Sequence, residues 1–193
     1  MSQVRNILIT GCSTGIGLDA AVTLQQQGFD VFATARKAQD VDHLRSLGLK
    51  ARMLDLTDEV SIKNAVKWVQ SETGGSLHAL FNNGAYGQPG ALEDLPTQAL
   101  KEQFDTNLIG WHQLTRHVIP IMRAQGFGRI VQNSSVLGLV AMPYRGAYNA
   151  SKFAIEGYTD TLRLELWNSN IQVSLIEPGP IDTRFRANAL LKF

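Results

Sequence analysis

A tyrosine and a lysine stand four residues apart at Tyr148 and Lys152, inside a segment with helical periodicity. Residues four apart lie on one face of a helix, so the phenol and the ammonium would be neighbours. A free phenol has a pKa of about 10, and an adjacent ammonium lowers that pKa by favouring the phenolate. A serine hydroxyl from a neighbouring strand end, where Ser134 and Ser135 lie, could bond the same substrate oxygen. This trio is suited to proton transfer at a carbonyl or alcohol oxygen, the alternative being a chance register of a surface Tyr and Lys.

A glycine-rich stretch runs from Thr10 to Gly17, where an apolar strand pattern gives way to a helical one. Glycines let a backbone approach a pyrophosphate closely, and a helix N-terminus offers unpaired N–H donors. The spacing is G-x-x-x-G-x-G and not the common G-x-G-x-x-G. Such glycines could merely make a tight turn, but the strand-to-helix context favours dinucleotide binding. The predicted cofactor contacts here are Gly11, Ser13, Thr14, Gly15, Ile16 and Gly17.

The same residues also satisfy G-x-S-x-G, the nucleophile elbow of serine hydrolases, with Ser13 as the nucleophile. A hydrolase would need an upstream loop for its oxyanion hole and a downstream Asp and His in loops. Only twelve residues precede Ser13, and the four histidines fall within expected helices or at a strand start. The hydrolase alternative is therefore disfavoured.

Two basic residues, Arg36 and Lys37, follow the second apolar strand, where the adenosine ribose of a bound dinucleotide would lie. An acid at this position accepts a hydrogen bond from the 2′-hydroxyl of NAD, whereas a basic residue receives the 2′-phosphate of NADP. The first acid along the chain is Asp40. Arg36 could be an ordinary solvated charge, but its guanidinium favours NADP (NADPH) over NAD.

Apolar runs and helical periodicities alternate along the chain, which predicts an α/β protein. The expected fold is a doubly wound parallel sheet (Rossmann fold) of about six strands, with helices on both faces and one domain over residues 1–193. Ligands would bind at the carboxyl ends of the strands. The predicted strands are 4–10, 29–35, 50–54, 77–82, 127–133 and 171–176. The predicted helices are 18–28, 41–47, one carrying Ile62, Val66 and Val69, a long one over 97–125 that Pro120 should kink, and 146–168.

The composition is ordinary for a globular protein, with 44% apolar and 18% charged residues and a formal net charge of +1. No run of Lys or Arg occurs, so nucleic acid and anionic membranes are poor candidate partners. No apolar run reaches the ~20 residues needed to span a bilayer. The single cysteine, Cys12, and the lack of a signal-peptide pattern predict a cytoplasmic location. No metal-ligand spacing and no P-loop are present, so no metal is expected.

Taken in order, these motifs resemble the classical short-chain dehydrogenase/reductase family, most closely its retinol and hydroxysteroid dehydrogenase branch. The resemblance implies that Ser135, Tyr148 and Lys152 are catalytic and that Lys152 bonds the nicotinamide ribose. It implies that Asn107 kinks the long helix and holds a proton-relay water. The further cofactor contacts that it implies are Asp55 at the adenine ring with Leu56 beside it, Asn83 and Gly84, Tyr148 and Lys152, and the loop of Pro178, Gly179, Ile181 and Thr183.

Two departures from the family pattern stand out. The usual Asn-Asn-Ala-Gly after the fourth strand is Asn82-Asn83-Gly84-Ala85 here, and Ala85 would be strained if its φ had to be positive. The chain also stops at Phe193, where the family's substrate-covering segment would begin. Either the sequence is a fragment of a longer protein or the site is open on one side.

The resemblance implies an NADP-dependent oxidoreductase that transfers a hydride between the nicotinamide and an alcohol or carbonyl substrate. Leu137, Val140, Met142 and Tyr144 suggest an apolar substrate, although such residues also pack as ordinary loop core. The alternative is a catalytically silent dinucleotide-binding or regulatory module. We also expect a homodimer through the segments 97–125 and 146–168. Its predicted contacts are a stripe of Phe104, Leu108 and Trp111 and the small residues Ala147, Ala150, Ala154 and Gly157.

Overall fold

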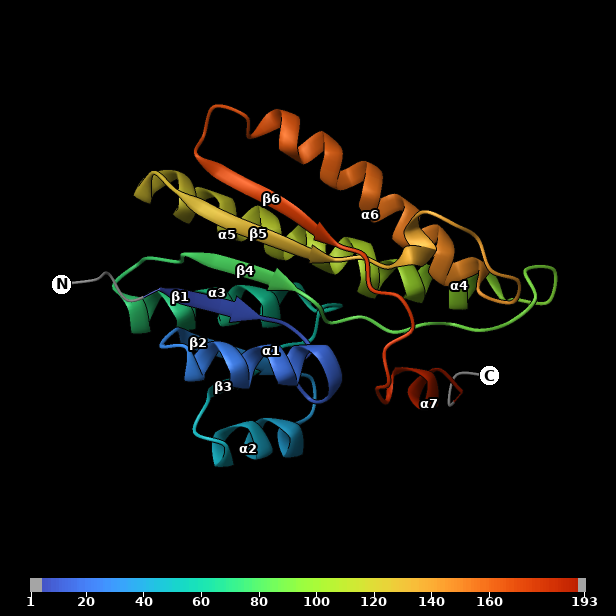
Figure 1. The fold of residues 1–193 in the computed structure, drawn as a ribbon, viewed down its shortest axis with the longest axis horizontal. Coiled ribbons are helices and arrows are strands. Elements are labelled where there is room, and N and C mark those ends of the chain that lie inside the picture. The colour runs from blue at the N-terminus through green and yellow to red at the C-terminus, as the bar shows by residue number, and fades with distance from the viewer. Residues whose placement is uncertain (1–4, 191–193) are drawn as a thin grey trace.

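The computed structural model describes residues 5–190, and its centre is a six-stranded sheet (Figure 1). All neighbouring strands are parallel, in the order β3-β2-β1-β4-β5-β6. This order is that of a doubly wound Rossmann sheet, so the predicted fold class is confirmed. Val4, where the first strand was predicted to begin, lies outside the described residues. The strands are β1 (Asn6–Ile9), β2 (Asp30–Ala35), β3 (Lys50–Met53), β4 (Ala79–Asn82), β5 (Gly128–Asn133) and β6 (Ile171–Ile176).

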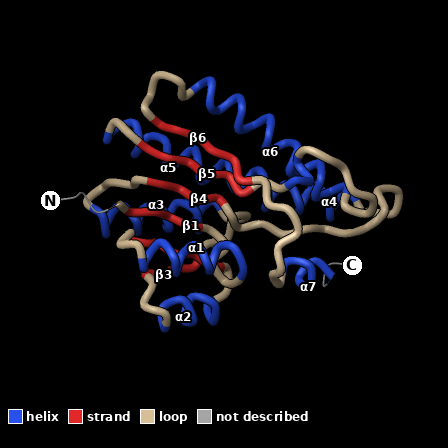
Figure 2. Tube along the Cα trace, in the orientation of Figure 1, coloured by secondary structure: helices blue, strands red, loops and turns tan. Residues whose placement is uncertain are grey.

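Helices cover both faces of the sheet, as the alternating pattern predicted (Figure 2). Successive side chains of β1 point to opposite faces, with Ile7 and Ile9 in one buried cluster and Leu8 in the other. The first cluster packs against α1 (Gly15–Gln26) and α2 (Ala38–Ser46). The second packs against helices that follow later in the chain, α3 (Glu59–Thr73), α5 (Gly110–Gln125) and α6 (Gly146–Glu165).

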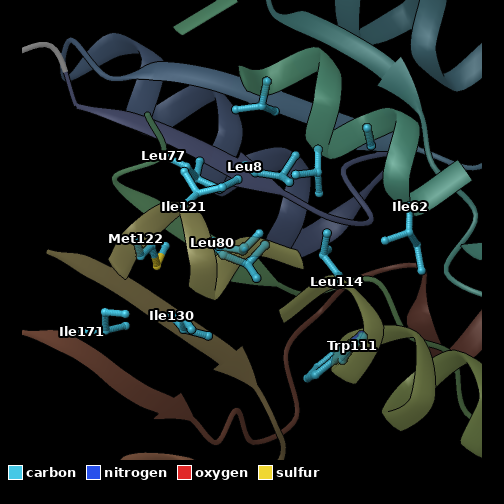
Figure 3. Packing of buried hydrophobic residues seen from close by; sticks show 14 of the residues in the cluster. Leu8, Ile62, Leu77, Leu80, Trp111, Leu114, Ile121, Met122, Ile130 and Ile171 are labelled. Atoms are coloured by element: carbon cyan, nitrogen blue, oxygen red, sulfur yellow. The ribbon is translucent and has the colours of Figure 1, made fainter. Parts of the chain in front are cut away.

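The core on the α5 side is built from the inner stripe of that helix. Trp111, Leu114 and Met122 are fully buried and face the strand residues Leu80 and Ile130 (Figure 3). Burying a large apolar side chain contributes roughly 1.5–3 kcal/mol. This stripe therefore fixes α5 against the sheet, and with it the polar residues at the helix's amino end.

The predicted long helix over 97–125 is interrupted. It begins as α4 (Thr97–Phe104), passes through a π-helical segment at Asp105–Ile109, and continues as α5. The α-helix runs on through Pro120 to Gly126, whose φ of 83° ends it. π-helical turns inside α-helices are frequent at functional sites. The segment contains Asn107, the residue at which the resemblance placed a kink.

Two short elements were not predicted. A 3₁₀ turn, Val136–Gly138, follows β5, and a helix, α7 (Phe185–Leu190), follows β6. Figure 1 shows α7 beside the carboxyl ends of the strands. Among the described non-glycine residues a positive φ occurs at Tyr144 and Asn170, so the strain considered for Ala85 does not arise. Over residues 5–190 no helix has the length and apolarity required to cross a membrane.

Candidate active site

Tyr148 and Lys152 are neighbours on α6, as their spacing predicted. The Lys152 Nζ lies 5.5 Å from the centre of the Tyr148 ring and 4.6 Å from the centre of the Trp111 ring. The same nitrogen donates a hydrogen bond of 2.7 Å to the carbonyl oxygen of Asn133, at the end of β5. Both side chains are buried. The ammonium is therefore held between two aromatic rings and a strand-end carbonyl.

Burial shifts the pKa values of both Lys152 and Tyr148. It lowers the pKa of the Lys152 ammonium to about 7, and the negative charge of Glu156 opposes that change. Burial also raises the pKa of the Tyr148 phenol, while a hydrogen bond with the Ser135 side chain acts in the opposite direction. In the protein alone burial thus sets the direction of the phenol's pKa shift, and the expected lowering of that pKa by Lys152 stays a prediction. At neutral pH the phenol carries its proton and can act as a donor.

Ser135 reaches this pair from the segment that follows β5. Its Oγ accepts a hydrogen bond of 3.1 Å from the backbone N–H of Leu137 and so caps the 3₁₀ turn. The backbone N–H of Val136 donates to the carbonyl of Pro178 at 3.1 Å, which joins this turn to the loop after β6. Ser135 is buried, and the effect of its side chain on the pKa of the Tyr148 phenol indicates that the two hydroxyls lie near each other.

Asn107 lies within the π-helical segment and is fully buried. Its Oδ1 accepts from the backbone N–H of Tyr86 at 3.2 Å, and its Nδ2 donates to the Tyr86 carbonyl at 3.0 Å. Nδ2 also lies 3.2 Å from the hydroxyl of Ser151 on α6. The side-chain amide thus fixes the loop after β4 to α6, and both of its N–H groups are engaged by protein.

The glycine-rich loop is closely packed against the segment after β4. Gly11 has a φ of 70°, and a Cβ there would lie 2.5 Å from the Cα of Gly84. A Cβ at Gly17 would lie 2.4 Å from the Gly11 carbonyl oxygen and 2.5 Å from the Asn83 Nδ2. Asn83 holds the two segments together, since its Nδ2 donates to the carbonyls of Thr10 and Gly11 at 2.9 and 3.1 Å. Side chains at these glycines would therefore displace the loop.

A cleft of about 700 Å³ opens beside this loop at the carboxyl ends of the strands. The residues around it fit a dinucleotide, because glycine backbone lines one side, basic side chains line another, and the first turn of α1 has no side-chain cap from Thr14. The predicted contacts that line the cleft are Gly11, Ser13, Thr14, Arg36, Asp55, Leu56 and Gly84.

Other predicted cofactor contacts lie outside the walls of that cleft. Gly15 faces the loop after β6, since a Cβ there would lie 3.2 Å from the Cβ of Thr183. Thr183 Oγ1 accepts from the backbone N–H of Phe185 at 3.2 Å. Ile16 packs on the α1 face of the core, and Ile181 and Gly179 are exposed. The structure thus brings Thr183 to the glycine-rich loop, whereas Ile181 is not among the residues that line the cleft.

Asp55 and Arg36, at the end of the cleft proposed for adenosine, differ in whether their side chains are held by hydrogen bonds or lie exposed. Asp55 Oδ1 accepts from the N–H and hydroxyl of Thr57 at 2.9 and 2.8 Å, which fixes the carboxylate at the cleft. Burial raises the pKa of the Tyr86 phenol, and the positive charge of the exposed Arg36 partly opposes that effect. Asp40 and Arg184 line the same cleft.

Neither the cysteine nor the histidines form a second reactive centre with Ser13. Burial raises the pKa of the Cys12 thiol to about 12, so the thiol is unreactive. His78 lies at the amino end of β4, where its backbone N–H bonds Asn6, and His112 pairs with Tyr158. Within residues 5–190 no three His, Cys, Asp or Glu side chains are grouped as metal ligands.

A parallel sheet in the order 3-2-1-4-5-6, a glycine-lined cleft and a buried Ser-Tyr-Lys set define a dinucleotide-fold oxidoreductase. The family model for short chain dehydrogenases matches residues 5–192. The chain therefore belongs to the short-chain dehydrogenase/reductase family, whose members are nicotinamide-dependent oxidoreductases acting on CH–OH or carbonyl groups.

Individual relatives agree with this assignment. The chain is 47% identical over 184 residues to the uncharacterized oxidoreductase YbbO of Escherichia coli K12, covering 95% of this chain and 68% of YbbO. It is 38% identical over 196 residues to bovine retinol dehydrogenase 8, covering 96% of this chain and 62% of that protein. The solved structure of a variant actinorhodin polyketide ketoreductase with NADPH superposes with a TM-score of 0.90 at 31% identity, covering 97% of this chain and 76% of that one.

Several residues of the site were not singled out from the sequence. Gln103 is fully buried, donates to the Tyr86 carbonyl at 2.8 Å and accepts from the Gln88 N–H at 2.7 Å. Its position four residues before Asn107 is a signal that could have been used, because both side chains then face the same loop. Phe185 of α7, with its ring 5.5 Å from that of Tyr148, had no comparable signal.

Proposed function

We propose that the protein is an NADPH-dependent reductase of an aldehyde or ketone, working through Ser135, Tyr148 and Lys152. The observation that supports the proposal is the geometry of the buried set: the Tyr148 phenol lies one helical turn from Lys152, and the buried Ser135 side chain acts on that phenol from the segment after β5. When bound, the nicotinamide would supply the hydride. The chain's own task is then to orient the carbonyl and to deliver one proton to its oxygen.

Each residue of the set has a distinct role in this proposal. Tyr148 donates its proton to the carbonyl oxygen, and Ser135 polarises and orients that oxygen through its hydroxyl. Lys152 places positive charge beside the phenolate that remains and would bond the nicotinamide ribose. Asn107 fixes the loop after β4 to α6 through Tyr86 and Ser151, which keeps the catalytic helix in register with the cofactor cleft. The loop of Pro178, Gly179, Ile181 and Thr183 would hold the carboxamide.

NADP is proposed over NAD because of the basic side chains at one end of the cleft. Arg36 and Lys37 both line it directly after β2. A guanidinium pairs with a phosphate through two parallel hydrogen bonds, and NAD has no phosphate at this position. The related ketoreductase structure contains NADPH. Asp40, an acid of the kind that binds the ribose 2′-hydroxyl of NAD, lines the same end of the cleft. The ratio of the NADP and NAD affinities therefore tests this proposal.

An apolar substrate is proposed from the loop between Ser135 and Tyr148. Leu139, Val140, Met142 and Tyr144 are 60%, 58%, 54% and 69% exposed, an unusual concentration of large apolar side chains beside a reactive group. A relative at 38% identity is named a retinol dehydrogenase. These features support medium- to long-chain aldehydes and ketones as the first compounds to test.

The test compares NADPH oxidation with a panel of apolar aldehydes and ketones, followed at 340 nm in the presence of about micromolar protein. NADPH affinity is measured in parallel from its fluorescence. Turnover that depends on the carbonyl compound supports the reductase. Binding of NADPH without turnover of any compound would instead favour the silent dinucleotide-binding module.

We further propose a homodimer through α4, α5 and α6. Ile109, Phe153 and Leu164 are 43%, 46% and 76% exposed on these helices, and Gly157 has no neighbouring atom within 4 Å of a Cβ position. Trp111 and Ala147, two residues predicted to contact the partner, are 0% and 1% exposed within the protein's own core. That part of the predicted interface is wrong. Sedimentation at micromolar concentration tests the dimer, and a species at the 21.2 kDa monomer mass contradicts it.

The cytoplasmic location stays a prediction.

A further inference from the structure

Glu156 lies on the face of α6 that carries the catalytic pair, because Tyr148, Lys152 and Glu156 follow one another at intervals of four. Its Oε1 accepts a hydrogen bond from the hydroxyl of Ser134, the residue before Ser135. The Glu156 side chain is partly buried, and Ser134 is 3% exposed. The partly buried Glu156 carboxylate thus lies between α6, which carries Tyr148 and Lys152, and the segment that carries Ser135.

The surroundings of this carboxylate are closely fitted. A Cβ at Gly138 would lie 2.9 Å from Glu156 Oε1, 2.9 Å from Ser134 Oγ and 3.1 Å from Glu156 Cγ. The segment from Ser134 to Gly138 therefore lies close against the carboxylate, and a side chain at Gly138 would displace the Glu156 carboxylate and the Ser134 hydroxyl from their present contact. Since Ser135 belongs to this segment, its position depends on that contact.

The charge of Glu156 has a specific neighbour. Lys152 faces the Trp111 ring from α5, the Asn133 carbonyl from β5, and the Tyr148 phenol and Glu156 from its own helix. The phenol is neutral at neutral pH because burial raises its pKa. Glu156, one helical turn from Lys152 on α6, is then the anion whose charge opposes the effect of burial on the ammonium.

We propose that Glu156 is a positioning residue of the active site. Its carboxylate joins the segment that presents Ser135 to the helix that presents Tyr148 and Lys152, and it supplies the counter-charge of the Lys152 ammonium. The effect on turnover rests on the proposed function, whereas the effect on Lys152 can be measured without any substrate or cofactor.

The first test follows the titration of Lys152 by NMR in ¹³C-lysine-labelled protein, with the signal assigned by its loss in Lys152→Met. Glu156→Gln keeps an oxygen that can accept from Ser134 but removes the charge, and Glu156→Leu removes both. Both variants should move the Lys152 midpoint to lower pH by roughly half a unit or more, because a nearby opposite charge favours the charged form. Ser134→Ala and the exposed control Glu165→Gln should leave it unchanged. An unchanged midpoint in Glu156→Gln overturns the counter-charge role.

The second test uses NADPH oxidation with decanal or the best compound of the panel. Glu156→Leu should lower kcat by about tenfold or more while NADPH affinity changes only a few-fold, since a small displacement of Ser135 misaligns the reacting groups. Glu156→Gln should retain more of kcat than Glu156→Leu, and in both variants the basic limb of the kcat profile should move to lower pH. Wild-type kcat and an unshifted profile in Glu156→Leu contradict the proposal. If the wild type reduces no compound, the proposed function fails, and the lysine titration still decides the role of Glu156.

Discussion

The ammonium of Lys152 on α6 donates a 2.7 Å hydrogen bond to the carbonyl oxygen of Asn133, the last residue of β5. The side chain of Asn133 in turn donates from Nδ2 to the Oδ1 of Asn83 at 2.8 Å. Asn83 donates to the carbonyl of Gly11 at 3.1 Å. One chain of hydrogen bonds therefore runs from Lys152 to the glycine-rich loop, and it couples the position of the proposed proton-transfer group to that of the proposed cofactor site.

The buried lysine predicts a pH-dependent stability. The pKa of Lys152 is about 7 in the folded protein, against about 10.4 in an unfolded chain. Between these values the unfolded state binds more protons, so stability rises with pH, and below pH ~7 the group contributes no further slope. Relative to Lys152→Met, the wild type should gain free energy of unfolding as the pH increases from about 7 to about 9.5. Urea unfolding at a series of pH values measures the difference.

A parallel comparison with Lys63→Met provides the control, because Lys63 is an exposed member of a surface ion pair. Its difference from the wild type should be nearly independent of pH over this range. A flat difference for Lys152→Met would mean that the lysine titrates normally in the folded protein.

Gln103 is expected to stabilise the loop after β4. Gln103→Leu removes the acceptor of the Gln88 N–H, a buried bond, and one donor to the Tyr86 carbonyl, a partly buried bond. Loss of such bonds costs about 1–3 kcal/mol. The exposed Gln98→Leu on the same helix should change the free energy of unfolding by no more than about 0.5 kcal/mol. Equal effects of the two substitutions would show that the buried amide is not needed.

Two glycines make a matched pair for the cofactor loop. Gly17→Ala puts a Cβ 2.4 Å from the Gly11 carbonyl oxygen and should displace the loop, whereas a Cβ at Gly157 meets nothing within 4 Å. Gly17→Ala should weaken NADPH binding by roughly tenfold or more, equivalent to ~1.4 kcal/mol. Gly157→Ala should bind normally and gain up to about 1 kcal/mol of stability in the middle of α6. Unchanged NADPH fluorescence titrations for Gly17→Ala would count against the assignment of this loop.

The cofactor preference is tested at Arg36. Arg36→Asp should weaken NADP far more than NAD, because a charge-assisted contact to a phosphate contributes about 1.5–3 kcal/mol. Arg52→Asp, at an exposed position on β3, serves as the charge control. If Arg36→Asp has the same ratio of NADP to NAD affinity as the wild type, Arg36 does not contact the 2′-phosphate.

The alternation of strands and helices and the register of Tyr148 and Lys152 were predictable, because apolar periodicity and a spacing of four are local properties of the chain. The turn made by the glycine-rich loop was predictable from its composition, whereas the close approach of Gly11 to Gly84, a distant segment, was not. The protonation states were not predictable. The sequence brings an ammonium to a phenol, but the depth at which both are buried depends on Trp111 and on segments distant in the chain.

Contacts across long sequence separations account for the other omissions. The bond between Ser134 and Glu156, and those from Gln103 to Tyr86 and Gln88, join segments that no periodicity relates. The π-helical segment around Asn107 is held by the side chain's bonds to Tyr86 and Ser151, so it too follows from tertiary structure and not from helix propensity.

The central claim is that the Tyr148 phenol donates the proton to the substrate oxygen, and Tyr148→Phe tests it most directly. The substitution keeps the buried ring and removes the hydroxyl, with Tyr158→Phe as the control, since the Tyr158 hydroxyl pairs with His112. We expect kcat for NADPH oxidation with the best carbonyl compound to fall roughly 10²–10⁴-fold. The Kd for NADPH should change only a few-fold. A Tyr148→Phe enzyme that keeps more than about a tenth of the wild-type kcat, against this expected loss, would contradict the account.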